Sequence, residues 1–302
     1  MAKKLLFIVN PYSGKGRLSS KILGIVDMFT KNGYDVTLYP TQKRGDATEV
    51  AVRLAEGFDR VVCAGGDGTL NEVVNGYMNK GVPMPPLGYI PCGTTNDFSK
   101  TLKIPRDAEA AAEIAVTGEP FPCDVGRFND SHFIYSAVFG AFSDVPYITP
   151  QSTKSLLGHA AYVLKGIERL SSLKRYTLEI EREGETISGD FILGMVTNSE
   201  SVAGFKKLAG LDVSLDDGLF EVLLIKMPNS LQDLYGIANA LLAHKMDSSG
   251  IYSFRAASLK IRSEEPLSWT LDGEFGGEHR QMQIDTVPGA VRYVVKDHLE
   301  GR

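Results

Sequence analysis

Two patterns of apolar and polar residues divide the chain near residue 125. In the first part, short apolar runs such as Leu5–Val9 alternate with stretches of helical periodicity such as residues 19–30. A continuous apolar run is typical of a strand buried on both faces. Repeated strand–helix units predict a parallel sheet with helices on both faces. Further strands are expected at 34–39, 60–64 and 87–90, and helices at 46–55, 69–79 and 107–116. Asp46 with Glu49 three residues on resembles a capping box that opens the first of these helices.

After Asp124 strand patterns dominate. Runs of strands separated by turn-like sequences favour a sandwich or a barrel-like second domain. Two helical patterns interrupt the strands, at about 155–173 and 230–244. The strands are expected at 133–138, 176–180, 191–196, 220–225, 257–261 and 291–295. We therefore predict two tightly joined domains.

The overall composition is that of an ordinary globular protein. The chain has 302 residues, of which 43% are hydrophobic and 23% are charged, and its formal net charge is −5. An acidic balance argues against a protein whose whole surface binds nucleic acid. Residues 1–45 are an exception, with eight basic and two acidic side chains. Their basic character is compatible with binding of an anionic ligand or surface.

The cysteines, histidines and apolar runs of the chain disfavour several classes of protein. Three scattered cysteines do not form a disulfide framework or a zinc motif, and the five histidines have no metal-binding spacing. No apolar run approaches the ~18 residues of a membrane span. The run Leu5–Val9 is shorter than a signal-peptide core. We expect a cytoplasmic protein, with contact to a membrane surface left open.

A glycine-rich segment, Gly65–Glu72, follows the third predicted strand and opens a helix. Glycines at such a turn let the backbone approach closely, and the N–H groups of a helix N-terminus attract anions. Asp67 within this segment is a candidate for holding Mg²⁺ on a nucleotide. The alternative is a tight Asp-Gly turn with no ligand.

Two further loops, Asn10–Gly16 and Cys92–Phe98, close the first and fourth predicted strands. Parallel strands share a carboxyl edge, where ligands bind in open α/β sheets. The three loops together therefore predict a nucleotide site, although each alone could be an ordinary turn. The first loop lacks both the Walker A spacing and the G-x-G-x-x-G fingerprint, which disfavours a standard P-loop or a dinucleotide site.

Acidic residues recur in two later turns. Asp272 and Glu274 lie around Gly273, and a phosphotransferase needs a carboxylate to accept the proton of the attacking hydroxyl. Glu274 would be that base and Asp272 the supporting acid. Asp216 and Asp217 precede Gly218 and could form an oxygen-ligand cation site. Either turn could instead be a hairpin with solvated acids.

Taken together, these motifs resemble the bacterial diacylglycerol-kinase-type lipid kinases, within the larger group that includes the sphingosine kinases and, more remotely, the NAD kinases. GGDGT alone is shared with other kinases, whereas the later LDDG and LDGE segments are more specific. The matching pieces, in family order, are Asn10–Lys15, Thr41 with Gly45–Ala47, Gly65–Glu72, Gly93–Phe98, Asp124–Gly126, Leu215–Gly218 and Leu271–Glu274.

The resemblance implies roles for individual residues. It implies Glu274 as the proton acceptor, within an acidic network of Asp67, Asp97, Asp124 and Asp272. It also implies a structural Mg²⁺ held by the Asp217 side chain and the carbonyls of Ser214 and Leu219. The implied ATP site comprises Asn10, Pro11, Tyr12, Ser13, Gly14, Thr41, Gly66, Asp67, Gly68, Thr69, Leu70, Asn71, Glu72 and Thr94.

The resemblance further implies a Rossmann-like three-layer α/β nucleotide domain over residues 1–125, rejoined by about 285–302. A β-sandwich lipid-acceptor domain would occupy 126–284. The implied reaction is ATP- and Mg²⁺-dependent phosphorylation of a lipid hydroxyl, with diacylglycerol giving phosphatidic acid. Phosphatidylglycerol, a sphingoid base or, remotely, NAD are alternative acceptors, and a non-catalytic nucleotide- or lipid-binding regulator is the alternative class.

The lipid substrate requires contact with a membrane that the chain does not span. The basic amphipathic pattern at 155–173 could lie on an anionic membrane or pack on a sheet. Exposed strand edges would permit a homodimer.

Overall fold

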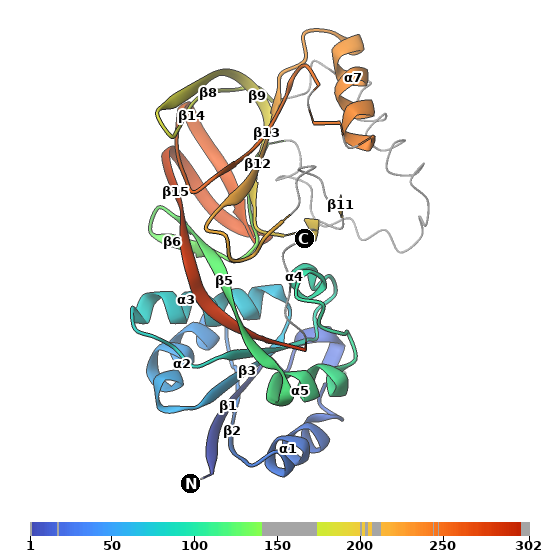
Figure 1. The fold of residues 1–302 in the computed structure, drawn as a ribbon, viewed down its shortest axis with the longest axis vertical. Coiled ribbons are helices and arrows are strands. Elements are labelled where there is room, and N and C mark those ends of the chain that lie inside the picture. The colour runs from blue at the N-terminus through green and yellow to red at the C-terminus, as the bar shows by residue number, and fades with distance from the viewer. Residues whose placement is uncertain are drawn as a thin grey trace.

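The computed structural model describes residues 2–16, 18–140, 174–199, 201–202, 205–206, 213–243, 245–246 and 248–296. Within these ranges, thirteen strands form one continuous sheet, and β10 (Ser201–Val202) pairs separately with β11 (Phe205–Lys206). The helical pattern predicted at 155–173 lies outside the described residues. Figure 1 shows helices gathered around the N-terminal strands and a mainly stranded region beyond them.

The N-terminal part follows the predicted alternation of strands and helices. The strands are β1 (Lys3–Val9), β2 (Tyr34–Pro40), β3 (Arg60–Gly65) and β4 (Leu87–Pro91). The helices are α1 (Ile22–Lys31), α2 (Asp46–Leu54), α3 (Asp67–Lys80), α4 (Asp97–Thr101) and α5 (Ala108–Thr117), with short 3₁₀ turns at Ser13–Gly16 and Ala55–Gly57. Helix α4 is the one α-helix in this part that the periodicity did not predict.

The four N-terminal strands pair in parallel in the order β2-β1-β3-β4. Their apolar runs are buried because helices cover both faces, with α2 and α3 on one side and α1 and α5 on the other (Figure 1). Parallel pairing brings the carboxyl ends of β1, β3 and β4 to the same edge. The fold therefore places the three glycine-rich loops together.

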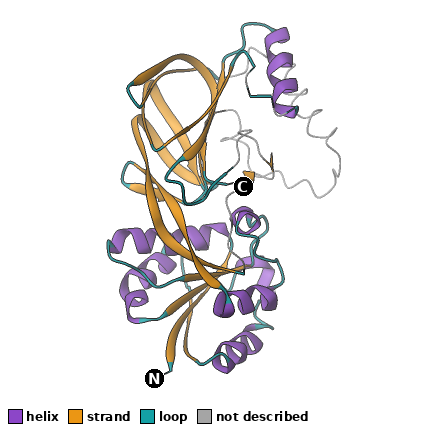
Figure 2. Ribbon diagram, in the orientation of Figure 1, coloured by secondary structure: helices purple, strands orange, loops and turns teal. Residues whose placement is uncertain are grey.

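The second part is built from antiparallel strands. They are β5 (Glu119–Phe128), β6 (Ser131–Phe133), β7 (Ser136–Gly140), β8 (Tyr176–Arg182), β9 (Glu185–Thr197), β12 (Phe220–Lys226), β13 (Ile251–Ala256), β14 (Ser258–Leu271) and β15 (Glu274–Val295). Helix α7 (Leu231–Leu242) packs near one end, where the 230–244 pattern predicted a helix. Figure 2 shows how strongly strands predominate here.

Four of these strands close a ring around an aromatic core. β9 and β14 each pair with β8 through one part of their length and with β7 through another. Trp269 lies inside the ring, fully buried, with its ring centroid 5.0 Å from those of both Phe128 and Phe139. Interlocked aromatic packing of this kind fixes the relative positions of the strands.

Strand β15 connects the two parts. It pairs with β14 at its start, then with β5, and Tyr293 near its end pairs in parallel with Leu87 of β4. In Figure 1, β5 and β15 run side by side from the stranded part down to the helical part. A separate, wholly parallel Rossmann-like sheet is therefore not confirmed. Within the described residues, parallel pairing is limited to the N-terminal strands and this one contact, because the sheet continues through antiparallel strands.

The predicted capping box at Asp46 and Glu49 was wrong. Helix α2 has Gly45 at its N-cap and no side-chain capping bond. Asp46 instead accepts a hydrogen bond from the Gln42 N–H at 2.7 Å. Its carboxylate therefore shapes the loop that precedes the helix. None of the helices in the described ranges is long and apolar enough to cross a membrane.

Glu221 on β12 is a buried acid that predicts a pH effect. Its side chain is fully buried with the Arg255 Nε 3.4 Å from Oε1, and burial raises its pKa from 4.5 to about 7. The folded protein then holds a proton that the unfolded chain has lost. The contribution of Glu221 to the free energy of unfolding is therefore complete below pH 4.5 and falls as the pH rises towards 7.

We expect the free energy of unfolding to fall by roughly 3 kcal/mol between pH 4.5 and 7 in the wild type relative to Glu221→Gln. Urea unfolding of both proteins across this range measures the difference. The variant keeps the shape of the side chain and cannot titrate, so other ionisable groups cancel. Parallel pH profiles would show that Glu221 is not protonated in the folded protein.

Candidate active site

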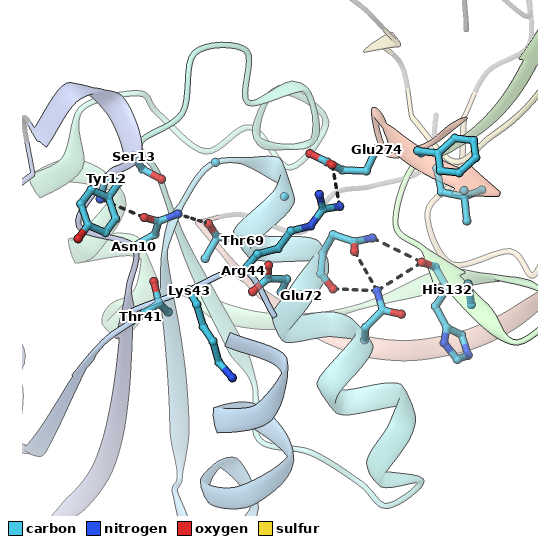
Figure 3. A pocket seen from close by; sticks show the side chains of 18 of the residues that line it. Asn10, Tyr12, Ser13, Thr41, Lys43, Arg44, Thr69, Glu72, His132 and Glu274 are labelled. Carbon is cyan, nitrogen blue, oxygen red and sulfur yellow. Dashed lines mark hydrogen bonds and ion pairs between the residues drawn. The ribbon is translucent and has the colours of Figure 1, made fainter. Parts of the chain in front are cut away.

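A cavity of about 670 Å³ lies between the N-terminal strand ends and the β14–β15 hairpin. Figure 3 shows its side chains, with Asn10, Tyr12, Ser13 and Thr69 on one wall and Glu274 on another. The lining residues are Asn10, Tyr12, Ser13, Thr41, Gln42, Lys43, Arg44, Gly66, Gly68, Thr69, Asn71, Glu72, Asn75, Ser131, His132, Leu271, Glu274, Phe275 and Gly276. The cavity therefore unites two of the three predicted nucleotide loops, the first and the second, with the predicted base.

The three strand-end loops contact one another directly. The Asn10 N–H donates to the Ala64 carbonyl at 2.9 Å, and the Cys92 N–H donates to the Gly65 carbonyl at 2.7 Å. Asn10 Nδ2 also donates to Thr69 Oγ1 at 3.1 Å. These bonds hold the three loops together, so the edge of the sheet forms one continuous surface.

Two glycines make this close approach possible. Gly14 has φ +61°, and a Cβ added there would lie 2.2 Å from the Cys92 carbonyl oxygen. A Cβ on Gly93 would lie 2.7 Å from the Gly66 Cα. Real side chains do not fit at such distances, so both positions need glycine. Pro11 and Gly14 do not line the cavity themselves, and Gly14 acts by packing the first loop on the third.

The N-terminus of α3 faces the cavity. Its N-cap, Gly66, makes no side-chain hydrogen bond, and Gly66, Gly68 and Thr69 all line the space. The first N–H groups of a helix have no partner within the helix and carry its positive dipole end. This end of a fourteen-residue helix is suited to bind an anion.

Asp67 lies beneath this helix end rather than in the cavity wall. Its Oδ2 accepts a hydrogen bond from the Asp97 N–H at 3.1 Å. Its Oδ1 is buried and has no hydrogen-bond partner among the described residues. Burial raises the pKa of this carboxyl above its ordinary value. A buried acid with one unsatisfied oxygen fits an oxygen ligand for a hard cation such as Mg²⁺, directly or through water.

Several other predicted nucleotide residues support the site indirectly. Glu72 accepts hydrogen bonds from the Gly45 N–H at 2.8 Å and the Ala47 N–H at 3.3 Å. It thereby fixes the loop that carries Thr41. Leu70 is fully buried in the core. The Thr94 carbonyl accepts from Arg106 at 3.0 Å, and Thr94 does not line the cavity.

Glu274 reaches into the cavity from the hairpin between β14 and β15. Its Oε2 lies 2.9 Å from Arg44 Nη2 of the opposite loop, and its side chain is half-exposed. A Cβ added to Gly68 would lie 3.8 Å from Glu274 Oε1. The carboxylate therefore faces the N-terminus of α3 across a short gap.

Asp272 holds this hairpin in place. Its carboxylate accepts hydrogen bonds from the N–H groups of Ile134, Tyr135 and Ser136 at 2.6, 2.9 and 3.0 Å. A fourth comes from Asn71 Nδ2 of α3 at 2.7 Å. Burial raises the pKa of Asp272 to about 6, against the opposing effect of these donors. With its oxygens already hydrogen-bonded, Asp272 positions the site from behind and does not line the cavity.

The remaining predicted acids make separate contacts. Asp97 pairs with Lys100 at 2.6 Å. Asp124 accepts from the Gly218 and Gly289 N–H groups, each at 2.7 Å, and its contacts tie β5 to the 215–219 turn and to β15. Burial raises the pKa of Asp124 above its ordinary value.

The predicted metal site at Ser214, Asp217 and Leu219 lies in the turn that precedes β12. Asp217 Oδ1 accepts the Leu219 N–H at 3.0 Å, and the Asp217 side chain is exposed. In the described part of the chain, no three His, Cys, Asp or Glu side chains are grouped so as to hold a metal ion. One carboxylate and two carbonyls are nevertheless the oxygen donors that Mg²⁺ accepts alongside water.

Sequence reasoning missed several residues of the cavity. Arg44 lies between the matched Thr41 and the matched Gly45–Ala47, where its charge was an available signal. His132 and Asn75 were not identifiable, because the fold alone brings β6 against α3. There the His132 carbonyl accepts from both Asn71 and Asn75, at 3.5 and 3.4 Å. Burial lowers the pKa of the His132 imidazole.

The Asp272 contacts lead to a stability prediction. Asp272→Asn places an NH₂ group against N–H donors, so at least one buried hydrogen bond is lost. We expect the free energy of unfolding to fall by about 2–4 kcal/mol, measured by urea unfolding. Asp130→Asn, on the exposed turn nearby, is the matched control and should change stability by less than about 0.5 kcal/mol. Equal effects of the two substitutions would contradict the structural role assigned to Asp272.

Two family models match the chain. The diacylglycerol kinase catalytic domain matches residues 4–128, and the YegS C-terminal NAD kinase beta sandwich-like domain matches residues 140–295. These matches cover both the cavity loops and the hairpin that faces them.

Relatives that match over most of their length are also diacylglycerol kinases. The chain is 38% identical to a diacylglycerol kinase of Bacillus subtilis over 280 residues, 91% of each chain. It is 38% identical to a diacylglycerol kinase of Staphylococcus aureus, over 92% of this chain and 88% of the relative. A solved diacylglycerol kinase structure from Bacillus anthracis superposes with a TM-score of 0.76 at 26% identity, covering 98% and 97% of the two chains. The chain therefore belongs to the diacylglycerol kinase family of phosphotransferases that act on an alcohol acceptor.

Proposed function

We propose that this protein transfers the γ-phosphate of ATP to the hydroxyl group of a lipid, with diacylglycerol as the leading acceptor and phosphatidic acid as its product. One observation carries the proposal. The carboxylate of Glu274 faces the N-terminus of α3 within the same cavity, and a Cβ on Gly68 would lie 3.8 Å from it. A proton acceptor and an anion-binding helix end thus lie within the reach of one phosphoryl transfer.

ATP would lie along the edge formed by the three strand-end loops. The triphosphate would approach Gly66, Gly68 and Thr69 at the helix N-terminus, where backbone N–H groups offset its charge. Asn10, Tyr12, Ser13 and Thr41 would line the remainder of the nucleotide site. Glu72, Asn71, Leu70, Gly14 and Thr94 would hold the shape of these loops rather than contact the phosphates.

The reaction would place the lipid hydroxyl between Glu274 and the terminal phosphate. As the hydroxyl oxygen forms its bond to phosphorus, its proton passes to Glu274, the bond from phosphorus to the bridging oxygen breaks, and ADP leaves. Asp272 would keep Glu274 in position through the hairpin. When bound, Mg²⁺ would neutralise phosphate charge, and Asp67 Oδ1, which has no hydrogen-bond partner among the described residues, would be available to hold it. A second, structural Mg²⁺ is proposed at the Asp217 turn.

A lipid acceptor is supported by an apolar side chain next to the base. Phe275 follows Glu274, lines the cavity and has 71% of its surface exposed. An exposed aromatic ring at the mouth of a polar cavity suits contact with acyl chains. We further propose that the protein meets its acceptor at a membrane surface, without a spanning helix, and that exposed strand edges permit a homodimer.

Glu274→Gln tests the reaction directly. We expect it to lower phosphate transfer by at least ~100-fold because the proton acceptor is lost. The measurement is transfer of labelled γ-phosphate from ATP and Mg²⁺ to diacylglycerol, phosphatidylglycerol and a sphingoid base in mixed micelles.

The matched control is Glu278→Gln, an exposed acid four residues along the same strand, which should keep its activity. A different labelled lipid would correct the acceptor, and ATP binding with no labelled lipid would favour a regulator. Full activity of Glu274→Gln would contradict the assigned base.

Gly14→Ala tests the nucleotide edge. The added methyl group would lie 2.2 Å from the Cys92 carbonyl, so the first loop must move away from the other two. We expect ATP affinity to fall by roughly tenfold or more, measured by calorimetry. Gly33→Ala is the control, because Gly33 also has a positive φ and its added Cβ would meet nothing within 4 Å. Equal losses in both variants would mean that backbone strain, not loop contact, sets the affinity.

A further inference from the structure

Arg44 connects the loop after β2 with the hairpin that carries Glu274. Its Nη2 lies 2.9 Å from Glu274 Oε2, and the two residues are far apart in the sequence. Figure 3 shows the guanidinium extending across the cavity to the carboxylate. This ion pair joins the two walls of the proposed active site.

The loop that presents Arg44 is firmly held. Glu72 accepts hydrogen bonds from the N–H groups of Gly45 and Ala47, and Asp46 accepts one from the Gln42 N–H. The backbone on both sides of Arg44 is thus anchored while its side chain is 80% exposed. The head group can change partners without any movement of the loop.

Arg44 differs from the neighbouring cation. Lys43 and Arg44 are the lysine and arginine side chains that line the cavity within the described ranges. Lys43 pairs with Glu49 at 3.1 Å and points away from Glu274 in Figure 3. Arg44 is therefore the side chain that brings positive charge to the base.

The carboxylate of Glu274 lies where two anion-binding groups converge. One oxygen contacts Arg44, and the other lies near Gly68 at the positive end of α3. A phosphate group seeks the same environment of guanidinium and helix N–H donors. The Glu274 carboxylate thus lies in a position that a phosphate group would also favour.

We propose that Arg44 is a γ-phosphate-binding residue that exchanges its partner. When ATP binds, the guanidinium transfers from Glu274 to the terminal phosphate, which frees the carboxylate to accept the proton of the lipid hydroxyl. Before ATP binds, the ion pair keeps the base occupied. The proposal rests on the proposed function of the cavity and adds an order of events to it.

The exchange predicts opposite effects of removing the two partners. Arg44→Gln removes a donor to the terminal phosphate, so affinity for a non-hydrolysable ATP analogue should fall roughly tenfold, and affinity for ADP by less than ~3-fold. Glu274→Gln removes the competing anion, so affinity for the analogue should rise although phosphate transfer is lost. Adding Glu274→Gln to Arg44→Gln should give no such rise, because without the guanidinium the carboxylate has no partner to compete for.

Calorimetric titration of the full-length protein with each nucleotide and Mg²⁺, in the absence of lipid, measures these affinities. Lys43→Gln removes the neighbouring charge and should leave the ratio of analogue to ADP affinity unchanged. Arg44→Lys keeps the charge without the planar fork and should give an intermediate loss, which also guards against misfolding of the glutamine variant.

Equal loss of ATP-analogue and ADP affinity in Arg44→Gln would overturn the assignment to the terminal phosphate. Unchanged or weaker analogue binding in Glu274→Gln would overturn the exchange. Neither outcome depends on the lipid acceptor. If the wild type labels no lipid but these affinities change as stated, the proposed function fails and the Arg44 assignment stands.

Discussion

The site depends on the four hydrogen bonds that converge on the Asp272 carboxylate. Three come from the consecutive N–H groups of Ile134, Tyr135 and Ser136, which lead into β7, and the fourth comes from Asn71 on α3. One buried acid therefore joins α3, whose N-terminus faces the cavity, to the hairpin that carries Glu274. Burial makes ionisation of Asp272 costly, and its donors offset that cost.

Other carboxylates likewise accept hydrogen bonds from backbone N–H groups. Glu72 holds the loop of Arg44, Asp46 shapes its start, and Asp124 joins β5 to the turns at Gly218 and Gly289. Each accepts backbone N–H groups that a loop would otherwise leave unsatisfied. Asp67 differs because one of its buried oxygens has no partner among the described residues. That difference sets Asp67 apart as the acid suited to a cation, whereas the others maintain geometry.

Much of the N-terminal fold could be predicted because its signals are local. Apolar runs define β1, β3 and β4, and glycine-rich loops follow each of them. The parallel arrangement then requires these loops to meet, as the Asn10–Thr69 and Cys92–Gly65 bonds confirm. The continuous sheet could not be predicted, because β15 changes partners from β14 to β5 and β4 through long-range pairing. His132 was not expected in the cavity because only the fold brings β6 against α3. Arg44 was missed although its charge lies between two matched motif positions, and Asp46 was assigned to a helix cap that does not form.

On the proposed function, the strand-end loops and the Glu274 hairpin form one phosphoryl-transfer site. The decisive test is a crystal structure of the protein with Mg²⁺ and a non-hydrolysable ATP analogue. We expect the terminal phosphate to lie at the N-terminus of α3, contacted by Arg44, with Glu274 turned from the guanidinium towards the space for the acceptor. A nucleotide bound outside this cavity, or an intact Arg44–Glu274 pair beside an uncontacted γ-phosphate, would contradict it.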